Sequence, residues 1–92
     1  MITPELGRLR EKIEGIDREL IELIAARVRL ARDVGTEKRA AGLPTLDPKR
    51  EAAVVRRAVV IARDAGLESD DEIRQIFWQI IGLSRRAQSR DQ

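Results

Sequence analysis

Apolar residues recur along the N-terminal part of the chain in alternating steps of three and four, which places them on one face of an α-helix. The series consists of Leu6, Leu9, Ile13, Ile16, Leu20, Leu23, Leu30 and Val34. Thr3 followed by Pro4 is a typical helix start. The next proline is Pro44, and Gly42 before it suits a helix end. The pattern predicts one helix over about residues 4–41.

Two shorter amphipathic segments follow. Asp47 and Pro48 form a second start signal and Gly66 an end signal, so a helix is expected over about residues 48–65. Apolar residues recur at helical spacing again after this glycine and predict a third helix over about residues 70–89. Because no stretch alternates with the period of two that is typical of strands, the sequence predicts an all-α fold.

The first predicted helix is too long for a compact chain of 92 residues. It would span roughly 57 Å, whereas a compact chain of this length has a radius of gyration of about 12 Å. The two shorter helices cannot cover both ends of such a rod, so a second copy of the chain is the simplest cover. We therefore predict a single domain of residues 1–92 with three helices, assembled as an intertwined homodimeric helical bundle.

Polar residues interrupt the apolar faces of all three predicted helices. They are Arg10, Arg27 and Lys38 on the first helix, Arg50 and Glu51 on the second, and Ser84 and Gln88 on the third. Each one alone is more simply explained as an ion pair at a helix edge or as a cationic stem that reaches water. Several buried cations with one carboxylate are costly, however, unless an anion pairs with them. The set predicts a pocket for a small polyanionic ligand inside the bundle.

Distances along the first helix separate its cations into two groups. Arg27 and Lys38 would lie about 16 Å apart along the axis, so two long side chains can converge on one small ligand. Arg10 would lie a further ~25 Å from Arg27 and cannot join them within one chain. If two copies of the helix pair antiparallel about a two-fold axis near residues 21–22, the partner's Arg10 falls near residue 33. We expect two equivalent pockets per dimer, each completed by an arginine from the other subunit.

The composition limits the chemistry of such a pocket. The chain has no cysteine and no histidine, which argues against thiol chemistry, a zinc site and a histidine base. Lys and Arg number 18 against 16 Asp and Glu, with the two signs interspersed, so we expect no nucleic-acid partner. No apolar run approaches a membrane span or a signal peptide, so we expect a cytoplasmic protein without a membrane partner.

Three segments carry a combination of motifs at fitting spacing. They read LREKIEGIDRELIELIAARVRLARDVGTEK, DPKRE and IIGLSRRAQ, and together they cover almost the whole chain. LRxKIxxID, LIxxR and VGxxK, joined to DxxRE and a final SxxxQ, resemble the all-helical chorismate mutases, the AroQ class. The resemblance implies a dimer of three-helix subunits that converts chorismate to prephenate, the branch step toward phenylalanine and tyrosine. Because no further domain accompanies the motifs, we expect the monofunctional bacterial or archaeal type, without feedback inhibition.

The resemblance also implies a role for each polar residue. Arg27 and the partner's Arg10 would bind the substrate carboxylates, and Lys38 and Gln88 would donate hydrogen bonds to the ether oxygen. Glu51 would accept a hydrogen bond from the ring hydroxyl, and Ser84 would contact the ring carboxylate. Asp47 and Arg50 would support the pocket mouth. The reaction is a pericyclic rearrangement that needs no nucleophile, metal or cofactor. It requires a fixed reactive conformer and stabilisation of the charge that develops on the ether oxygen.

Two other functions stay open on the sequence alone. An isochorismate-pyruvate lyase would share the fold and would eliminate pyruvate from a sister substrate. A helical interaction or nucleic-acid-binding module is the second alternative, because the chain is rich in arginine. Against this module, the cations fall on inner faces and no aromatic or glycine-rich recognition element accompanies them.

Four residues have no place in this scheme. Arg85 and Arg86 are expected to form a solvated helix end, where cations suit the helix dipole. Trp78 is expected to pack at the subunit contact rather than over the ligand. Gly35 costs the first helix about 1 kcal/mol relative to alanine, and the sequence does not say whether a backbone or a ligand approaches it.

Overall fold

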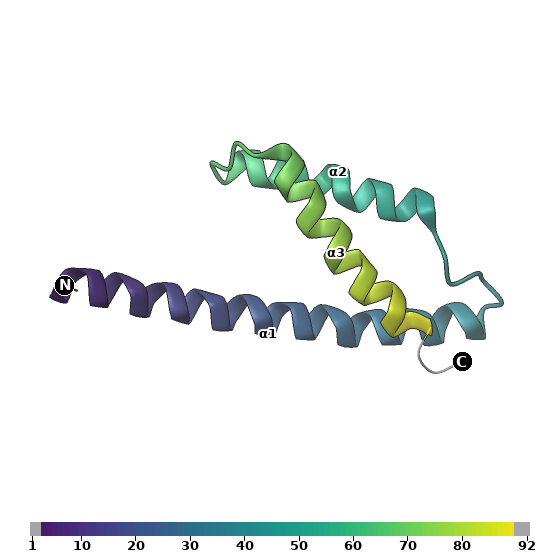
Figure 1. Ribbon diagram of the computed structural model, residues 1–92. Helices are drawn as coiled ribbons and strands as arrows, with labels where there is room; N and C mark the ends of the chain where they lie inside the picture. Colours follow the sequence, from purple (N-terminus) through teal and green to yellow (C-terminus); the bar gives the residue numbers. More distant parts are fainter. Residues whose placement is uncertain (1–2, 90–92) are drawn as a thin grey trace.

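The computed structural model describes residues 3–89, which form three α-helices joined by short loops (Figure 1). α1 spans Pro4–Ala40, α2 spans Pro48–Asp64 and α3 spans Asp70–Ser89. No strand occurs among the described residues, and the predicted all-α class with three helices per chain is confirmed. None of these helices, over the part of the chain described, has the length and apolar character needed to cross a membrane.

The first two helices begin and end at signals that stand in the sequence. The side chain of Thr3 accepts a hydrogen bond from the backbone N–H three residues later at 3.0 Å, and that of Asp47 does the same at 3.1 Å. Gly42 and Gly66 follow the two helix ends with φ of +70° and +89°. This left-handed conformation strains other residues but not glycine. The caps therefore fix both loops, and with them the place where α2 begins.

α3 connects the other two helices. Figure 1 shows α3 running from the end of α2 down to the C-terminal half of α1, and it packs on both of them. Val54 and Val55 of α2 and Ile81 of α3 form the buried core, with Phe77 packed against it. The core thus lies between α2 and α3, whereas α1, among the helices described, packs on α3 alone.

The N-terminal half of α1 extends away from the rest of the molecule (Figure 1). The chain measures 59 × 26 × 17 Å with a radius of gyration of 17.0 Å, against the ~12 Å expected of a compact chain of this length. Residues 8–23 are all exposed. The large apolar residues left exposed on this part of α1 are Leu6, Leu9, Ile13, Ile16, Leu20, Ile21 and Leu23.

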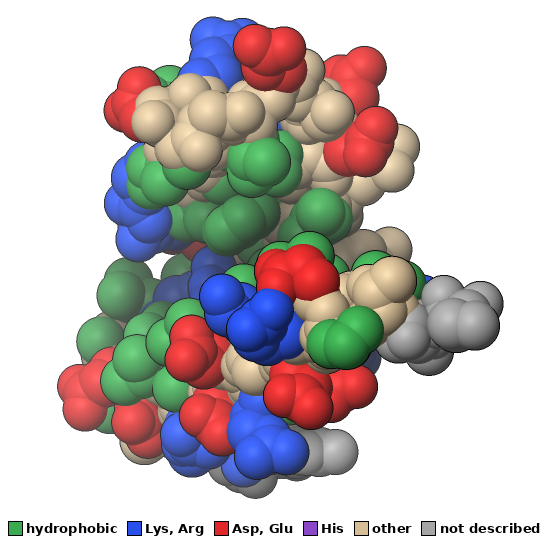
Figure 2. All heavy atoms as spheres, turned by 90° about the vertical axis from the view of Figure 1, so that its left-hand side faces the viewer, with side chains coloured by type: hydrophobic (Ala, Val, Ile, Leu, Met, Phe, Trp, Pro, Cys, Tyr) green, Lys and Arg blue, Asp and Glu red, His purple; other side chains and the backbone are tan. Residues whose placement is uncertain are grey.

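Apolar side chains also border the opening between α1 and the other two helices. Figure 2 looks at the molecule from the side on which α1 begins and shows hydrophobic side chains gathered along this opening. An apolar groove of about 310 Å³ lies here, lined by residues that include Val54, Ile61 and Phe77. Apolar surfaces of this extent are typical of an interaction site. The homodimer that would cover them stays a prediction.

Candidate active site

A pocket of about 430 Å³ lies between the three helices, each of which contributes lining residues. It contains seven of the eight candidate residues, which are Arg27 and Lys38 from α1, Asp47 from the loop before α2, Arg50 and Glu51 from α2, and Ser84 and Gln88 from α3. The remaining lining residues are apolar and consist of Leu30, Ala31, Val34, Val54 and Ile81. A pocket of this volume, apolar apart from a few converging polar groups, suits a small organic ligand.

Lys38 and Gln88 are joined by a hydrogen bond inside this pocket. Lys38 Nζ donates to Gln88 Oε1 at 2.9 Å and to the backbone carbonyl of Thr45 at 2.8 Å. An ammonium has three N–H donors, so a third one is left for a ligand. Gln88 uses its amide oxygen toward Lys38, which leaves its NH₂ group to donate to the same ligand. The pair therefore presents hydrogen-bond donors side by side.

Arg27 and Ser84 form a second polar contact between α1 and α3. Arg27 Nη1 donates to Ser84 Oγ, and Ser84 is buried. Burial lowers the pKa of the Arg27 guanidinium, and the positive charges of Arg50 and Arg57 lower it further. Cations that repel one another in a partly desolvated position are stabilised by an anion that binds among them. The electrostatics of the pocket thus favour an anionic ligand.

The start of α2 is tied to the pocket by two contacts. Asp47 Oδ1 accepts a hydrogen bond from the backbone N–H of Arg50, which fixes the first turn of α2. Lys38 binds the Thr45 carbonyl in the preceding loop and so ties that loop to α1. Asp47 therefore acts as a helix cap and as a lining residue at once, and the cap brings Arg50 and Glu51 to the pocket.

Glu51 is paired with an arginine outside the candidate set. Arg85 Nε donates to Glu51 Oε2 at 3.1 Å and Arg85 Nη2 to Glu51 Oε1 at 2.5 Å. The Glu51 carboxylate raises the pKa of Arg85. Arg85 is exposed, as expected of a solvated helix end, but the sequence did not predict its pairing with Glu51. The two residues lie 34 positions apart on different helices, and helical spacing within one segment carries no signal for such a pair.

Gly35 lies where the end of α3 crosses α1. A Cβ at this position would lie 2.7 Å from the backbone oxygen of Gln88 and 2.8 Å from its Cα. Arg39 Nη1 donates to the same Gln88 carbonyl at 2.6 Å. The glycine therefore allows the backbone of α3 to approach α1 closely enough for the Gln88 side chain to reach Lys38.

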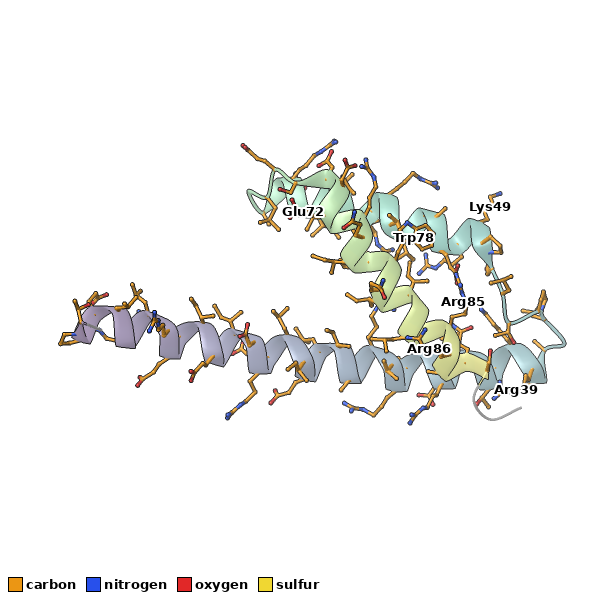
Figure 3. The ribbon with its side chains drawn as sticks, in the orientation of Figure 1. Arg39, Lys49, Glu72, Trp78, Arg85 and Arg86 are labelled. Atoms are coloured by element: carbon orange, nitrogen blue, oxygen red, sulfur yellow. The ribbon has the colours of Figure 1, made fainter. Side chains whose placement is uncertain are left out.

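Arg10 is the one candidate that a single chain does not bring to the pocket. It is exposed on the protruding half of α1, ~25 Å along the helix from Arg27. Its predicted role therefore requires the second copy of the chain. Trp78 also lies outside the pocket, 44% exposed on α3 (Figure 3), and its packing at a subunit contact stays a prediction.

A metal site was not found in the part of the chain described. Within residues 3–89, no group of three or more carboxylates converges in a way that could hold a metal ion. The polar groups of the pocket are instead mostly donors, carried by Arg27, Lys38, Arg50 and Gln88. The site can therefore bind carboxylates and stabilise negative charge on an oxygen.

Comparison with known proteins identifies the family. The profile of the family described as chorismate mutase type II matches residues 9–89. Over 84 residues, the chain is 32% identical to a chorismate mutase of Methanocaldococcus jannaschii, covering 91% of this chain and 84% of that protein. A solved structure of a conserved hypothetical protein from Pyrococcus furiosus is similar with a TM-score of 0.74 and 34% identity, covering 94% of this chain and 97% of that one.

A longer protein also contains a matching segment. A T-protein of Haemophilus influenzae is 42% identical over 65 residues, which cover 71% of this chain and 17% of that protein. The chain thus spans less than a fifth of the T-protein and most of the archaeal chorismate mutase. On the family profile and the archaeal relative together, this chain belongs to the chorismate mutase type II family.

Proposed function

We propose that this chain is a chorismate mutase, which isomerises chorismate to prephenate in phenylalanine and tyrosine biosynthesis and works as a cytoplasmic homodimer. The observation that carries the proposal is that the adjacent donors of Lys38 and Gln88 share one pocket with Arg27 and Glu51. Membership of the chorismate mutase type II family supports it.

The proposed reaction breaks an ether C–O bond and forms a C–C bond within one molecule. No proton has to be transferred, so the chain needs no general base for it. In the proposal, Arg27 and the partner's Arg10 bind the two carboxylates, while Glu51 accepts a hydrogen bond from the ring hydroxyl. These contacts select the compact conformer in which the reacting carbons lie close together.

Lys38 and Gln88 supply the electrostatic part of the proposed mechanism. Negative charge grows on the ether oxygen as its bond to carbon lengthens. Donors that are already fixed before the reaction stabilise this charge without further reorganisation. The hydrogen bond between Lys38 and Gln88 at 2.9 Å and the one from Lys38 to Thr45 at 2.8 Å support such fixed donors.

Two apolar surfaces support the homodimer. One is the exposed apolar face along the protruding half of α1. The other is the groove of about 310 Å³ between the helices, which Arg27 also lines. If the half-helix of one chain fills the groove of the other, both faces are buried and the partner's Arg10 comes close to the pocket.

A direct assay tests the proposed function. The purified chain is incubated with chorismate, whose disappearance is followed by its absorbance while the product is identified by chromatography against prephenate. A parallel incubation with isochorismate is analysed for salicylate and pyruvate. Prephenate formation supports the mutase, whereas salicylate and pyruvate without prephenate would identify a lyase instead.

The pH dependence of the rate tests whether Gln88 donates a hydrogen bond to the ether oxygen. An amide donates at every pH, whereas a glutamate donates only when protonated. We expect kcat/KM of the unmodified chain to vary little around neutrality. In Gln88→Glu it should fall near neutrality and recover only toward pH ~4.3 or below, because Lys38 favours the charged form of the new carboxylate. Paired pH–rate profiles measure this, and a sharp acid optimum of the unmodified chain would contradict it.

Gly35→Ala is expected to lower both stability and activity. Alanine is normally favoured over glycine in a helix by about 1 kcal/mol, but here the new methyl group meets the backbone of Gln88. Shifting α3 should cost about 1–3 kcal/mol and move Gln88 away from Lys38. Thermal unfolding and kcat/KM measure the two effects. Gly15→Ala, whose new Cβ meets nothing within 4 Å apart from the local backbone of its own helix, is the matched control, and equal behaviour of the two variants would contradict the close approach.

A further inference from the structure

The Glu51 carboxylate is held from outside the pocket. Glu51 lines the pocket, whereas Arg85 is not among its lining residues. Arg85 binds both carboxylate oxygens, at 3.1 Å and 2.5 Å. The side chain of Arg85 is 46% exposed and that of Glu51 only 17%. Figure 3 shows Arg85 extending from α3 toward the start of α2. The carboxylate is thus the inner partner of the bridge and the guanidinium the outer one.

This bridge leaves Glu51 able to bind a ligand. An ionised carboxylate offers about four lone-pair positions on its two oxygens. Arg85 occupies one position on each oxygen. The other positions remain available to a hydroxyl donor in the pocket. A two-point contact also fixes the plane of the carboxylate, which a single hydrogen bond would not do.

Other cations in the pocket compete for the same carboxylate. Arg27, Lys38 and Arg50 line the pocket together with Glu51. If Glu51 were free to rotate, opposite charges in a partly desolvated space would draw it toward one of them. That pairing would remove a hydrogen-bond acceptor and a cation from the ligand at once. Arg85 satisfies Glu51 from the outer side and so leaves these cations free to bind an anion.

We propose that Arg85 is a positioning residue for ligand recognition, which holds Glu51 so that it accepts the substrate hydroxyl and does not neutralise the pocket cations. This inference rests on the proposed chorismate mutase function. The inference adds to that function one residue of α3, Arg85, which sets substrate affinity without touching the substrate. Because the effect concerns binding before the reaction, it should appear mainly in KM rather than in kcat.

Replacements at Arg85 and at its neighbour test the proposal in the full chain. Arg85→Gln removes the two-point bridge, and Arg85→Lys keeps the charge but not the planar fork. Arg86→Gln removes the same charge one position along α3 and is the matched control, since Arg86 is exposed and outside the pocket. With chorismate as the substrate, we expect KM to rise about tenfold in Arg85→Gln and less in Arg85→Lys, with kcat within about threefold. Arg86→Gln should leave both constants unchanged.

A double-mutant cycle with Glu51→Gln separates this role from a structural one. If Arg85 acts through Glu51, adding Arg85→Gln to Glu51→Gln changes KM no further. Independent, multiplicative effects would overturn the proposal, as would an unchanged KM in both Arg85 variants or an equal rise in Arg86→Gln. If Arg85→Gln does not fold, Arg85→Lys carries the comparison alone, and an unchanged KM in that variant then overturns the proposal.

Different results would contradict the proposed function and the proposed role of Arg85. A folded, unmodified chain that does not convert chorismate contradicts the proposed function and the role of Arg85 with it. A chain that converts chorismate but tolerates the Arg85 replacements contradicts only the role of Arg85.

Discussion

Replacing Lys38 with alanine is expected to lower kcat about 10²–10³-fold, with a much smaller change in KM. This is the usual loss when one fixed donor to a developing negative charge is removed, and it corresponds to about 2.7–4 kcal/mol of transition-state stabilisation. The charge on the ether oxygen is small in bound chorismate and largest in the transition state. A donor aimed at this oxygen therefore contributes more to turnover than to binding.

Lys38 also has a structural contact, which the experiment must separate from its catalytic role. Its hydrogen bond to the Thr45 carbonyl should contribute only about 1 kcal/mol to the free energy of unfolding. Thermal unfolding measures that part, while steady-state kinetics at saturating chorismate measure kcat. Lys49→Ala is the control, because Lys49 is an exposed lysine at the start of α2 that does not line the pocket (Figure 3). Near-normal turnover of Lys38→Ala would refute the assignment of Lys38 to the ether oxygen.

The helices could be predicted because their signals are local. Thr3 and Asp47 cap the helices that follow them, and Gly42 and Gly66 adopt the positive φ that ends them. Each signal acts within a few residues of its own position, so no knowledge of the tertiary fold is needed to interpret it. The extended shape followed in the same way, because the length of α1 is incompatible with a compact chain of this size.

The pocket could be anticipated only in part. A polar residue on an apolar helix face is visible in the sequence, and six of the seven residues marked in this way lie around one pocket. Their partners across helices are not visible. The contact of Arg27 with Ser84 and that of Glu51 with Arg85 depend on where α3 crosses the other two helices. Gly35 is a further example. The low helix propensity of a glycine in α1 is visible in the sequence, but the backbone of Gln88, which requires a glycine there, lies on another helix.

The reaction cannot be inferred from the same sequence signals as the fold. The pattern of charges predicts a receptor for a small dianion, and the donors that line the pocket fit such a ligand. A rearrangement needs no nucleophile, base or metal, so no reactive side chain marks it in the sequence. The family relationship is what points from an anion receptor to this particular isomerisation. The assays are therefore aimed at turnover of chorismate rather than at anion binding alone.

Arg10→Ala is expected to lower kcat/KM for chorismate about 10²-fold or more while leaving the dimer intact. Losing one partner of a desolvated charge pair commonly has an effect of this size, and removing the exposed Arg10 side chain leaves every apolar residue of α1 in place. Steady-state kinetics measure the loss, and size-exclusion chromatography with thermal unfolding checks the assembly. Arg8→Ala is the control, because residues two positions apart lie on nearly opposite sides of a helix, so Arg8 points away from the side that carries Arg10. Unimpaired kcat/KM in Arg10→Ala would contradict the shared site.

Mixing two inactive variants gives the sharper test of the shared site. Homodimers of Arg10→Ala and of Lys38→Ala each lack one required residue in both pockets. In a mixed dimer, one pocket combines Lys38 of the Arg10→Ala chain with the partner's Arg10 and is complete, whereas the other pocket lacks both residues. Random pairing of equal amounts makes half of the dimers mixed, so co-refolding should restore roughly a quarter of the unmodified activity. If Arg10 acted within its own chain, every pocket would still lack one residue and the mixture would stay as inactive as its parents.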